Sequence, residues 1–226
     1  MVPESLRQAV SERLARALDR YANGVSGLLA GQASPIIRNR HRTGRDATAS
    51  SAEDKQIVKL ASFEALATAL ESAHVRYLVA GGVAVNAHGY LRFTHDVDLV
   101  IGLDPANIRC AFEALATIGY KPVVPISAEQ FANAELRQQW VRDKGMQVLN
   151  FYSDRHRETA VDIFVSEPFD FDQEYRSAMV GEVAPGLTVR FVSLPALIAM
   201  KQAVGRPRDR DDVDHLRMLM EDQSKK

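Results

Sequence analysis

The stretch from Tyr77 to Leu103, YLVAGGVAVNAHGYLRFTHDVDLVIGL, decides the fold because its apolar residues change their periodicity twice. A short apolar run typical of a buried strand stops at a pair of glycines, a small helical pattern follows, and an alternating pattern comes after that. We therefore expect a strand over residues 76–80, helical turns over residues 83–88 and a second strand over residues 97–101.

Asp96 and Asp98 stand two residues apart at the start of the second expected strand. In a strand, residues i and i+2 point to the same face, so both carboxylates project side by side while Val97 and Leu99 point to the other face. Two adjacent anions repel each other and lose hydration unless a cation lies between them. Oxygen ligands favour Mg²⁺, which binds a few carboxylates together with substrate phosphates. The pair therefore predicts a magnesium site.

Asp162 interrupts another apolar run, TAVDIFV at residues 159–165. An acid inside such a run is rarely buried without a partner. If the strand that carries it lies beside residues 97–101, Asp162 joins Asp96 and Asp98 in a set of three carboxylates. Such a set supports two-metal phosphoryl transfer, in which the ions hold the attacking and the leaving oxygens. The alternative for Asp162 is an exposed acid on an edge strand.

Gly81 and Gly82 stand where the first strand gives way to a helical turn. A backbone without Cβ atoms lets a ligand approach closely, and free N–H groups at a helix start bind phosphate. Arg92 and Thr94 lie just before the acidic pair, where they can contact phosphate or ribose. A glycine pair, then Asp-x-Asp, then a single strand aspartate is much more specific than any one of these signals.

Helical and strand patterns alternate along the rest of the chain. Helical patterns cover residues 57–72 and 105–118, a polar helix-plus-loop segment 127–145, a helix from Leu194 to about Ala203 capped by Ser193, and a last helix from about Asp209. Strand patterns cover residues 148–152, 159–165 and 187–192. This order predicts an α/β (α+β) fold, a short twisted mixed sheet with the acids on one face and helices on the other.

The composition is that of a globular chain, since 46% of the 226 residues are hydrophobic, 25% are charged and the net charge is −1. These values exclude wholesale disorder and give no overall case for nucleic-acid or membrane binding. Cys110 is the only cysteine, which excludes an internal disulfide. No stretch reaches the roughly 18 apolar residues of a membrane span, and the N-terminus lacks a signal-peptide pattern. We therefore expect a cytoplasmic protein with no membrane partner.

The first 50 residues differ from the rest of the chain. Residues 4–20 carry apolar side chains at helical spacing, and residues 31–53 are rich in arginine and small polar residues. We divide the chain into an N-terminal helical extension with an Arg-rich linker, residues 1–50, and a main domain, residues 51–226. Residues 1–60 hold ten Lys and Arg against six Asp and Glu. The extension is a candidate for self-association or partner binding.

Two motifs resemble the DNA polymerase β-like nucleotidyltransferase superfamily. The stretch GGVAVNAHGYLRFTHDVDL, residues 81–99, is similar to its pattern of a glycine pair, a short helix and hydrophobic-Asp-hydrophobic-Asp. The stretch VSLPALIAMKQAVGRPRDRDDVDHL, residues 192–216, resembles the helix lysine and the following Gly-Arg-x-Lys/Arg-Asp-x-x-Asp of standalone bacterial members. Those members include AbiEii-like abortive-infection toxins and drug-modifying nucleotidyltransferases. The resemblance covers roughly residues 56–220 and implies a nucleotidyltransferase-like fold for the main domain.

The resemblance implies a Mg²⁺-dependent transfer of a nucleoside monophosphate from an NTP to an acceptor hydroxyl, with release of pyrophosphate and with Mn²⁺ as the alternative ion. Asp96, Asp98 and Asp162 would be the catalytic and metal-binding residues, and Asp162 would help to deprotonate the acceptor. The nucleotide would be contacted by Gly81, Gly82, Arg92, Thr94 and Lys201. Gly82 stands where many members have serine, which removes a hydroxyl contact to phosphate but keeps the backbone N–H.

Several alternatives stay open at this level. Lys201 is either a phosphate ligand or a lysine whose stem lies on an apolar helix while its amine reaches water. We interpret Arg206, Arg208, Asp209 and Asp212 as a helix-start cap with ion pairs. The protein is either the enzyme or a non-catalytic nucleotide-binding module, for example one partner of a toxin–antitoxin pair. The acceptor is RNA, a protein or a small molecule, and an antitoxin is a further candidate partner.

Overall fold

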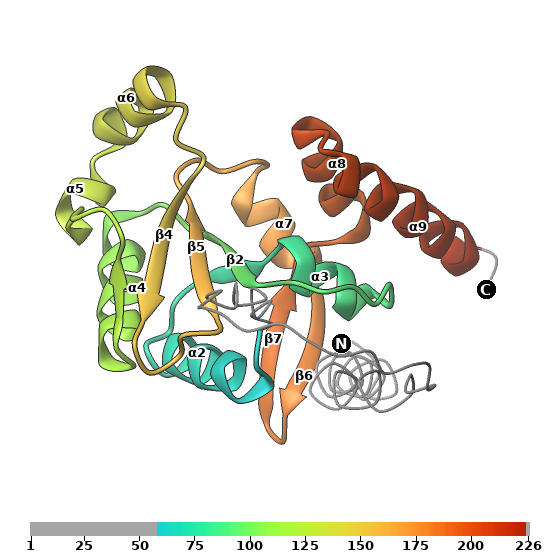
Figure 1. Cartoon of the computed structure of the whole chain (residues 1–226), viewed down its shortest axis with the longest axis horizontal. Helices are drawn as coiled ribbons and strands as arrows, with labels where there is room; N and C mark the ends of the chain where they lie inside the picture. The colour runs from blue at the N-terminus through green and yellow to red at the C-terminus, as the bar shows by residue number, and fades with distance from the viewer. Residues whose placement is uncertain (1–57, 225–226) are drawn as a thin grey trace, which may run out of the picture.

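A computed structural model describes residues 58–224 as one sheet surrounded by helices (Figure 1). The strands are β1 (Tyr77–Val79), β2 (Asp96–Ile101), β3 (Tyr120–Pro122), β4 (Val148–Ser153), β5 (Ala160–Phe164), β6 (Met179–Ala184) and β7 (Leu187–Phe191). The helices are α2 (Leu60–Ser72), α3 (Gly81–His88), α4 (Pro105–Thr117), α5 (Ala128–Ala132), α6 (Ala134–Lys144), α7 (Phe171–Ser177), α8 (Leu194–Val204) and α9 (Pro207–Ser224).

The seven strands form a mixed sheet in the order β3-β4-β5-β2-β1-β7-β6. β2 pairs in parallel with β5, and β1 pairs in parallel with β7. The other four neighbouring pairs are antiparallel. The predicted α/β class with a mixed sheet is therefore confirmed, and its centre is the pair of strands that carries the three aspartates.

The parallel pairing of β2 with β5 needs a crossover, because strands that run the same way cannot be joined by a tight turn. The crossover contains α4, β3, α5, α6 and β4. Asp104 caps α4, since its carboxylate accepts the N–H of Asn107, and Pro105 occupies the first turn. β4 then returns antiparallel to β5, which leaves β5 between β4 and β2.

Alternation along β2 separates the core from the acidic face. Val97 and Leu99 are fully buried, whereas Asp96 and Asp98 are only partly buried. α2 and α4 pack against each other, and Phe63 of α2 belongs to the same buried cluster as Val97 and Leu99. Burial of Val97 and Leu99 stabilises this orientation of β2 by roughly 25 cal/mol for each Å² of apolar surface removed from water. Asp96 and Asp98 therefore lie on the opposite face of the sheet.

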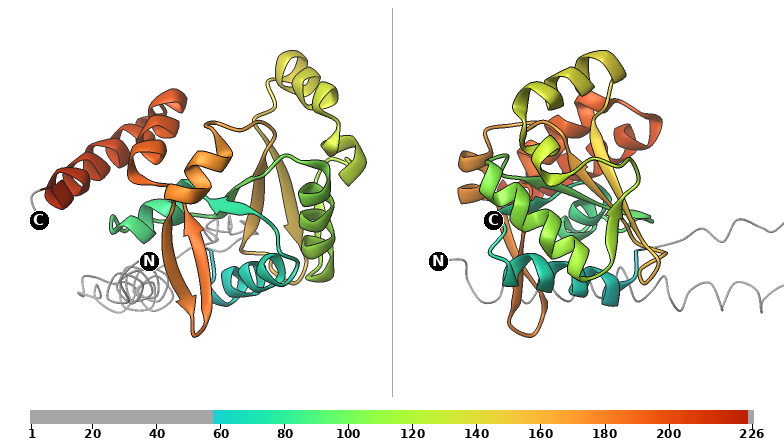
Figure 2. Two further views of the ribbon diagram at one scale, coloured as in Figure 1. Left: turned by 180° about the vertical axis from the view of Figure 1, so that it is seen from behind. Right: turned by 90° about the vertical axis from the view of Figure 1, so that its left-hand side faces the viewer.

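α8 and α9 form a helical pair at one end of the molecule, and α5 and α6 lie at the other end in Figure 1 and in the rear view of Figure 2. Ser193 caps α8, as the sequence predicts, because its hydroxyl accepts the N–H of Ala196. Gly205 ends α8 in a left-handed conformation with φ +66°. α9 contacts both α8 and α3. The C-terminal helices therefore lie beside the helix that begins at the glycine pair.

The structure has two elements, α7 and β6, in a region where the sequence patterns predict none. Asp170 caps α7 by accepting the N–H of Gln173. β6 forms an antiparallel pair with β7, with an irregularity between Glu182 and Ala184. β6 lies at the edge of the sheet, where its pairing with β7 stabilises it although its sequence shows no clear strand pattern.

The predicted N-terminal helical extension and Arg-rich linker, residues 1–50, lie outside the described residues. The division of the chain at residue 50 therefore stays a prediction. Within residues 58–224, none of the helices combines the length and the apolar character that crossing a membrane requires.

Candidate active site

Three aspartates from two neighbouring strands share one face of the sheet. In the parallel ladder of β2 and β5, Asp98 lies directly opposite Asp162, and Asp96 lies opposite Ala160. Because residues two apart in a strand point the same way, the Asp96 carboxylate projects on the same side as that of Asp98. The register confirms that the strand of Asp162 lies beside the strand of the acidic pair, on which the three-carboxylate hypothesis depends.

The glycine pair brings the start of α3 against these acids. Gly81 has φ +58°, and a Cβ at this position would overlap Oδ2 of Asp98 and lie 2.5 Å from its Cγ. A Cβ on Gly82 would lie 2.7 Å from the Cβ of Thr94 and 2.9 Å from Nη2 of Arg92. Only glycine leaves room for this approach, since Cβ atoms essentially never come within 3.0 Å of such neighbours. The backbone at the start of α3 is therefore directly beside the acidic face.

The loop between α3 and β2, residues 89–95, is held by Asn86. The amide nitrogen of Asn86 donates to the carbonyl of Arg92 over 3.0 Å, and its amide oxygen accepts the Arg92 N–H over 2.8 Å. Further along the loop, the buried Thr94 hydroxyl donates to a carboxylate oxygen of Asp96 over 3.3 Å. Arg92 and Thr94 thus lie at the edge of the acidic face, and their contact with phosphate or ribose stays a prediction.

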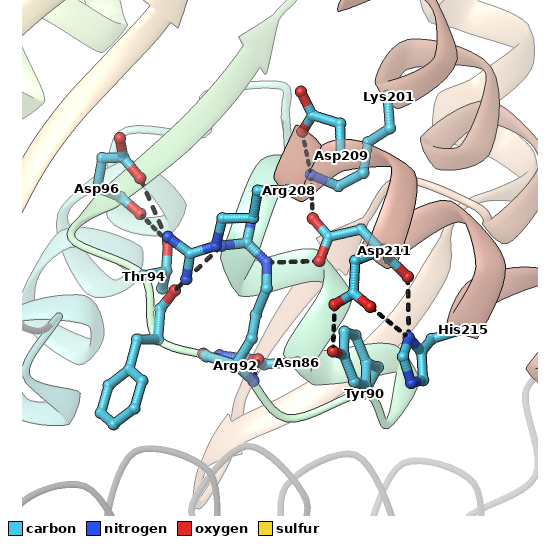
Figure 3. A network of polar contacts seen from close by, with 12 residues as sticks. Asn86, Tyr90, Arg92, Thr94, Asp96, Lys201, Arg208, Asp209, Asp211 and His215 are labelled. Carbon is cyan, nitrogen blue, oxygen red and sulfur yellow. Dashed lines mark hydrogen bonds and ion pairs between the residues drawn. The ribbon is translucent and has the colours of Figure 1, made fainter. Parts of the chain in front are cut away.

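Lys201 of α8 belongs to a buried ion-pair cluster (Figure 3). Its Nζ lies 2.7 Å from Oδ2 of Asp212 and 3.3 Å from Oδ1 of Asp209, both in α9. Nε of Arg92 lies 3.0 Å from the other carboxylate oxygen of Asp212. The side chain of Lys201 is only 7% exposed and that of Asp212 is fully buried. The alternative that the lysine amine reaches water is therefore wrong, and one buried carboxylate joins the two cations.

The predicted cap and ion-pair network at the start of α9 is confirmed for its acids. Oδ2 of Asp209 accepts the N–H of Arg206 over 3.2 Å, which caps the helix start, while its other oxygen faces the lysine. Arg208 instead donates to the carbonyl of Phe93. The start of α9 therefore contacts both α8 and the loop between α3 and β2.

The carboxyl group of Asp98 lies in an environment that disfavours its charge. Burial raises the pKa of Asp98 to about 7. The neighbouring carboxylates of Asp96 and Asp162 add to this rise, while the Lys201 and Arg92 cations lower the pKa. The same two cations also pair with the buried carboxylate of Asp212.

Asn150 of β4 orients Asp162. The two residues lie opposite each other in the antiparallel ladder of β4 and β5, and Nδ2 of Asn150 donates to Oδ1 of Asp162 over 2.8 Å. Burial raises the pKa of Asp162, and this hydrogen bond lowers it. Sequence reasoning missed Asn150, because its place beside Asp162 follows from the pairing of two strands and from no local signal. Its outward position in the alternating strand 148–153 was the one feature that could have drawn attention to it.

The donor set fits a divalent cation that prefers oxygen. Three carboxylates on one face supply oxygen atoms only, which suits Mg²⁺. Across residues 58–224, no three His, Cys, Asp or Glu side chains converge into a ready metal site. Mg²⁺ usually takes one or two carboxylates and completes its shell with water and substrate phosphates. The residues therefore fit an ion that binds together with a phosphate-bearing substrate rather than in an all-protein cage.

Seven chains of known structure match this chain, and two of them are described below. No protein-family model and no curated protein sequence matches the chain. The crystal structure of the lincosamide antibiotic adenylyltransferase LnuA, with lincomycin bound, is 14% identical over 72% of this chain and 99% of its own, with a TM-score of 0.45. An antigenic nucleotidyltransferase-like protein from Paracoccidioides brasiliensis is 18% identical over 71% of this chain and 74% of its own, with a TM-score of 0.39. At these scores the likeness carries no argument about function, which has to come from the residues of the site.

Proposed function

We propose that the protein is a nucleotidyltransferase, which moves a nucleoside monophosphate from an NTP to a hydroxyl acceptor and releases pyrophosphate. One observation carries this proposal: the parallel register of β2 and β5 sets Asp98 opposite Asp162, with Asp96 on the same face and the glycine start of α3 against Asp98. Carboxylates on one face of a sheet beside the N-terminus of a helix suit a phosphate group that arrives with a divalent cation.

The triphosphate would lie along the start of α3. Gly81 and Gly82 bring the start of α3 against Asp98 and Thr94, where N–H groups without a partner inside the helix can donate to phosphate oxygens. Arg92 and Thr94 border this region with a positive charge and a hydroxyl, and the Lys201 cation is near enough to Asp98 to lower its pKa. Their role would be to neutralise the negative charge of the triphosphate, equally in the bound substrate and in the transition state.

Asp96 and Asp98 would hold Mg²⁺, with Mn²⁺ as the alternative, and Asp162 would complete the set. These are hard oxygen donors, and a cation beside Asp98 would offset the burial that disfavours its ionised form. When bound, the ion would polarise the α-phosphate and neutralise charge on the departing pyrophosphate.

Asp162 is the candidate proton acceptor. The acceptor oxygen forms a bond to the α-phosphorus while the bond from that phosphorus to the bridging oxygen breaks, and pyrophosphate leaves with the bonding electron pair. The hydroxyl proton passes to the Asp162 carboxylate. Asn150 donates to Oδ1 of Asp162, which leaves Oδ2 for the acceptor. Catalysis would consist mainly of positioning and electrostatic stabilisation.

Three classes of acceptor hydroxyl suit this chemistry: an RNA 3′ end, a protein side chain and a small molecule. The first two would agree with a toxin of a toxin–antitoxin pair, and the third with a drug-modifying enzyme. A single assay can separate the three classes. Purified full-length protein is incubated with Mg²⁺, each α-³²P-labelled NTP in turn, and a cell extract that is afterwards separated into RNA, protein and small molecules.

Label that enters one fraction supports the proposal and identifies the acceptor class. Asp96→Ala and Asp98→Ala should each reduce the transfer at least about 10²-fold, because positioned charge supplies most of the rate, while circular dichroism stays unchanged. Asp154→Ala is the matched control, since this exposed aspartate lies in the turn between β4 and β5. Full transfer by both site variants would refute the assignment. Mg²⁺-dependent NTP binding without transfer would favour the non-catalytic binding module.

A further inference from the structure

The loop between α3 and β2, residues 89–95, carries two candidate nucleotide contacts, Arg92 and Thr94, and is held from two sides. On the α3 side, Asn86 makes both of its hydrogen bonds to the backbone of Arg92. On the other side lies α9, which reaches the loop with side chains of successive turns. The position of the loop therefore depends on where α9 is seated.

On the α9 side, Tyr90, Asp211 and His215 make a closed set of contacts, which we call the clasp (Figure 3). The Tyr90 hydroxyl donates to Oδ2 of Asp211 over 2.6 Å. The Tyr90 ring stacks on the His215 ring, with centroids 3.8 Å apart and 7° between the planes. Nδ1 of His215 lies 3.6 Å from Oδ1 of Asp211 and 2.9 Å from its carbonyl oxygen. Tyr90 of the loop thus contacts two residues of α9 that lie one helical turn apart.

The clasp and the buried ion-pair cluster lie on consecutive residues of α9. Asp211 is exposed and holds Tyr90, whereas the next residue, Asp212, is buried and holds Arg92 and Lys201. A shift of α9 that opened the clasp would also move the one carboxylate that joins the two cations. The clasp therefore acts on the site through this carboxylate.

α9 has few apolar contacts of its own. Of residues 207–223, only Asp212, Val213 and Leu216 are buried. With two buried apolar side chains, a helix of 18 residues buries little apolar surface against the rest of the protein. Segments with few buried apolar contacts open locally at low free energy, so the contacts of the clasp add to the buried Asp212 ion pairs in keeping α9 in place.

We propose that the clasp holds α9 on the loop between α3 and β2 and thereby positions Arg92 and Lys201 for the triphosphate. This inference rests on the proposed function. Tyr90, Asp211 and His215 are positioning residues, because they act through the two cations and not on the reacting atoms. The expected signature is a loss of nucleotide affinity with the turnover of bound nucleotide preserved.

The test measures binding of Mg²⁺ with each of ATP, GTP, CTP and UTP to the full-length chain by calorimetry. Tyr90→Ala removes both the stack and the hydrogen bond and should weaken binding about tenfold, equivalent to 1.4 kcal/mol. Tyr90→Phe keeps the stack and should recover part of that affinity. Asp211→Asn should also weaken binding. Asp214→Asn, the same charge change at an exposed position of α9 that makes no clasp contact, should bind like wild type.

Two further readouts separate positioning from a general loss of stability. In the label-transfer assay, the KM for NTP should rise in Tyr90→Ala by the same factor as the dissociation constant, with kcat preserved. Hydrogen exchange of the amides of residues 90–94 should accelerate in Tyr90→Ala and stay at the wild-type rate in Asp214→Asn. If Tyr90→Ala fails to fold, the same affinity and exchange measurements on the nearly isosteric variants Tyr90→Phe and Asp211→Asn test the inference.

Wild-type affinity together with wild-type exchange in the clasp variants would overturn the inference and leave the proposed function intact. Absence of nucleotide binding by the wild-type protein would instead overturn the proposed function, and the role of the clasp for the triphosphate with it. In that case the exchange measurement, which needs no nucleotide, still shows whether the clasp holds α9 on the loop.

Discussion

Replacing Gly81 with alanine tests whether the close approach of α3 to Asp98 is part of the site. The added Cβ would overlap Oδ2 of Asp98 and lie 2.5 Å from its Cγ and 2.9 Å from its Cβ. The backbone at φ +58° is left-handed, which costs an L-residue about 1–2 kcal/mol. The clash adds about 1–3 kcal/mol, because either the Asp98 side chain or the start of α3 has to move. We expect the free energy of unfolding to fall by about 2–5 kcal/mol in total.

Gly145→Ala is the matched control. Gly145 ends α6 with φ +62°, nearly the same backbone conformation, but nothing lies within 4 Å of a Cβ added there. This variant should lose only the backbone contribution of about 1–2 kcal/mol. The difference between the two variants, about 1–3 kcal/mol, isolates the clash with Asp98.

The assay combines urea unfolding, followed by circular dichroism, with label transfer. Gly81→Ala should lose about 10²-fold or more of the transfer, because Asp98 no longer keeps its place opposite Asp162. Gly145→Ala should transfer label like wild type. Equal losses of stability in the two variants, together with full transfer by Gly81→Ala, would show that the close approach has no part in the site.

Three further predictions concern polar groups of the site. The pKa of Asp98 is about 7 in the fold against an ordinary 3.8, so the metal-free fold binds this proton more tightly than the unfolded chain and should lose stability as the pH rises from about 4 to about 7. Urea midpoints in EDTA that stay level over this range, or that fall equally in Asp98→Asn, would contradict this reasoning. Asp212→Asn removes the buried charge between Lys201 and Arg92 and should lower the unfolding free energy by about 3–5 kcal/mol in the same urea assay. A loss below about 1 kcal/mol would be evidence against these ion pairs. Asn150→Ala leaves Asp162 without its hydrogen bond and should lower kcat about tenfold with little change in melting temperature, because Asn150 is exposed; an unchanged kcat would remove Asn150 from the site.

Local signals explain the elements that the sequence predicts correctly. Asp96 and Asp98 alternate with Val97 and Leu99, so the direction of the two acids follows from the pleat of a single strand. Ser193 is equally local, because its hydroxyl accepts an N–H of the helix that it begins. In both cases the interacting groups lie within a few residues of each other.

Elements without a local signal are missed. α7 has seven residues, too few for a clear helical period, and β6 is an edge strand whose sequence includes Gly181 and Glu182. Short helices and edge strands are stabilised mainly by tertiary packing, which no window of the sequence contains. The same limit applies to Asn150, whose importance depends on a partner in another strand.

Lys201 shows how burial excludes one interpretation of a residue, here the lysine whose amine reaches water, while its contact with phosphate stays a prediction. The sequence allows a lysine that reaches water as readily as one that faces phosphate. The structure buries the amine against Asp212 and Asp209, and Asp212 also pairs with Arg92. A buried lysine needs such partners, since an unpaired charge away from water is strongly unfavourable.

By itself, the sequence determined that two acids of one strand face the same way, that a glycine pair precedes them, and that a third acid stands in another apolar strand. Only the tertiary structure decided that β5 lies parallel beside β2 with Asp162 opposite Asp98, and that Asp212 joins Lys201 to Arg92. The physical reason is the range of the interactions. Side-chain direction within a strand depends on the geometry of a few consecutive residues, whereas strand pairing and buried ion pairs depend on how the chain as a whole covers its apolar surface.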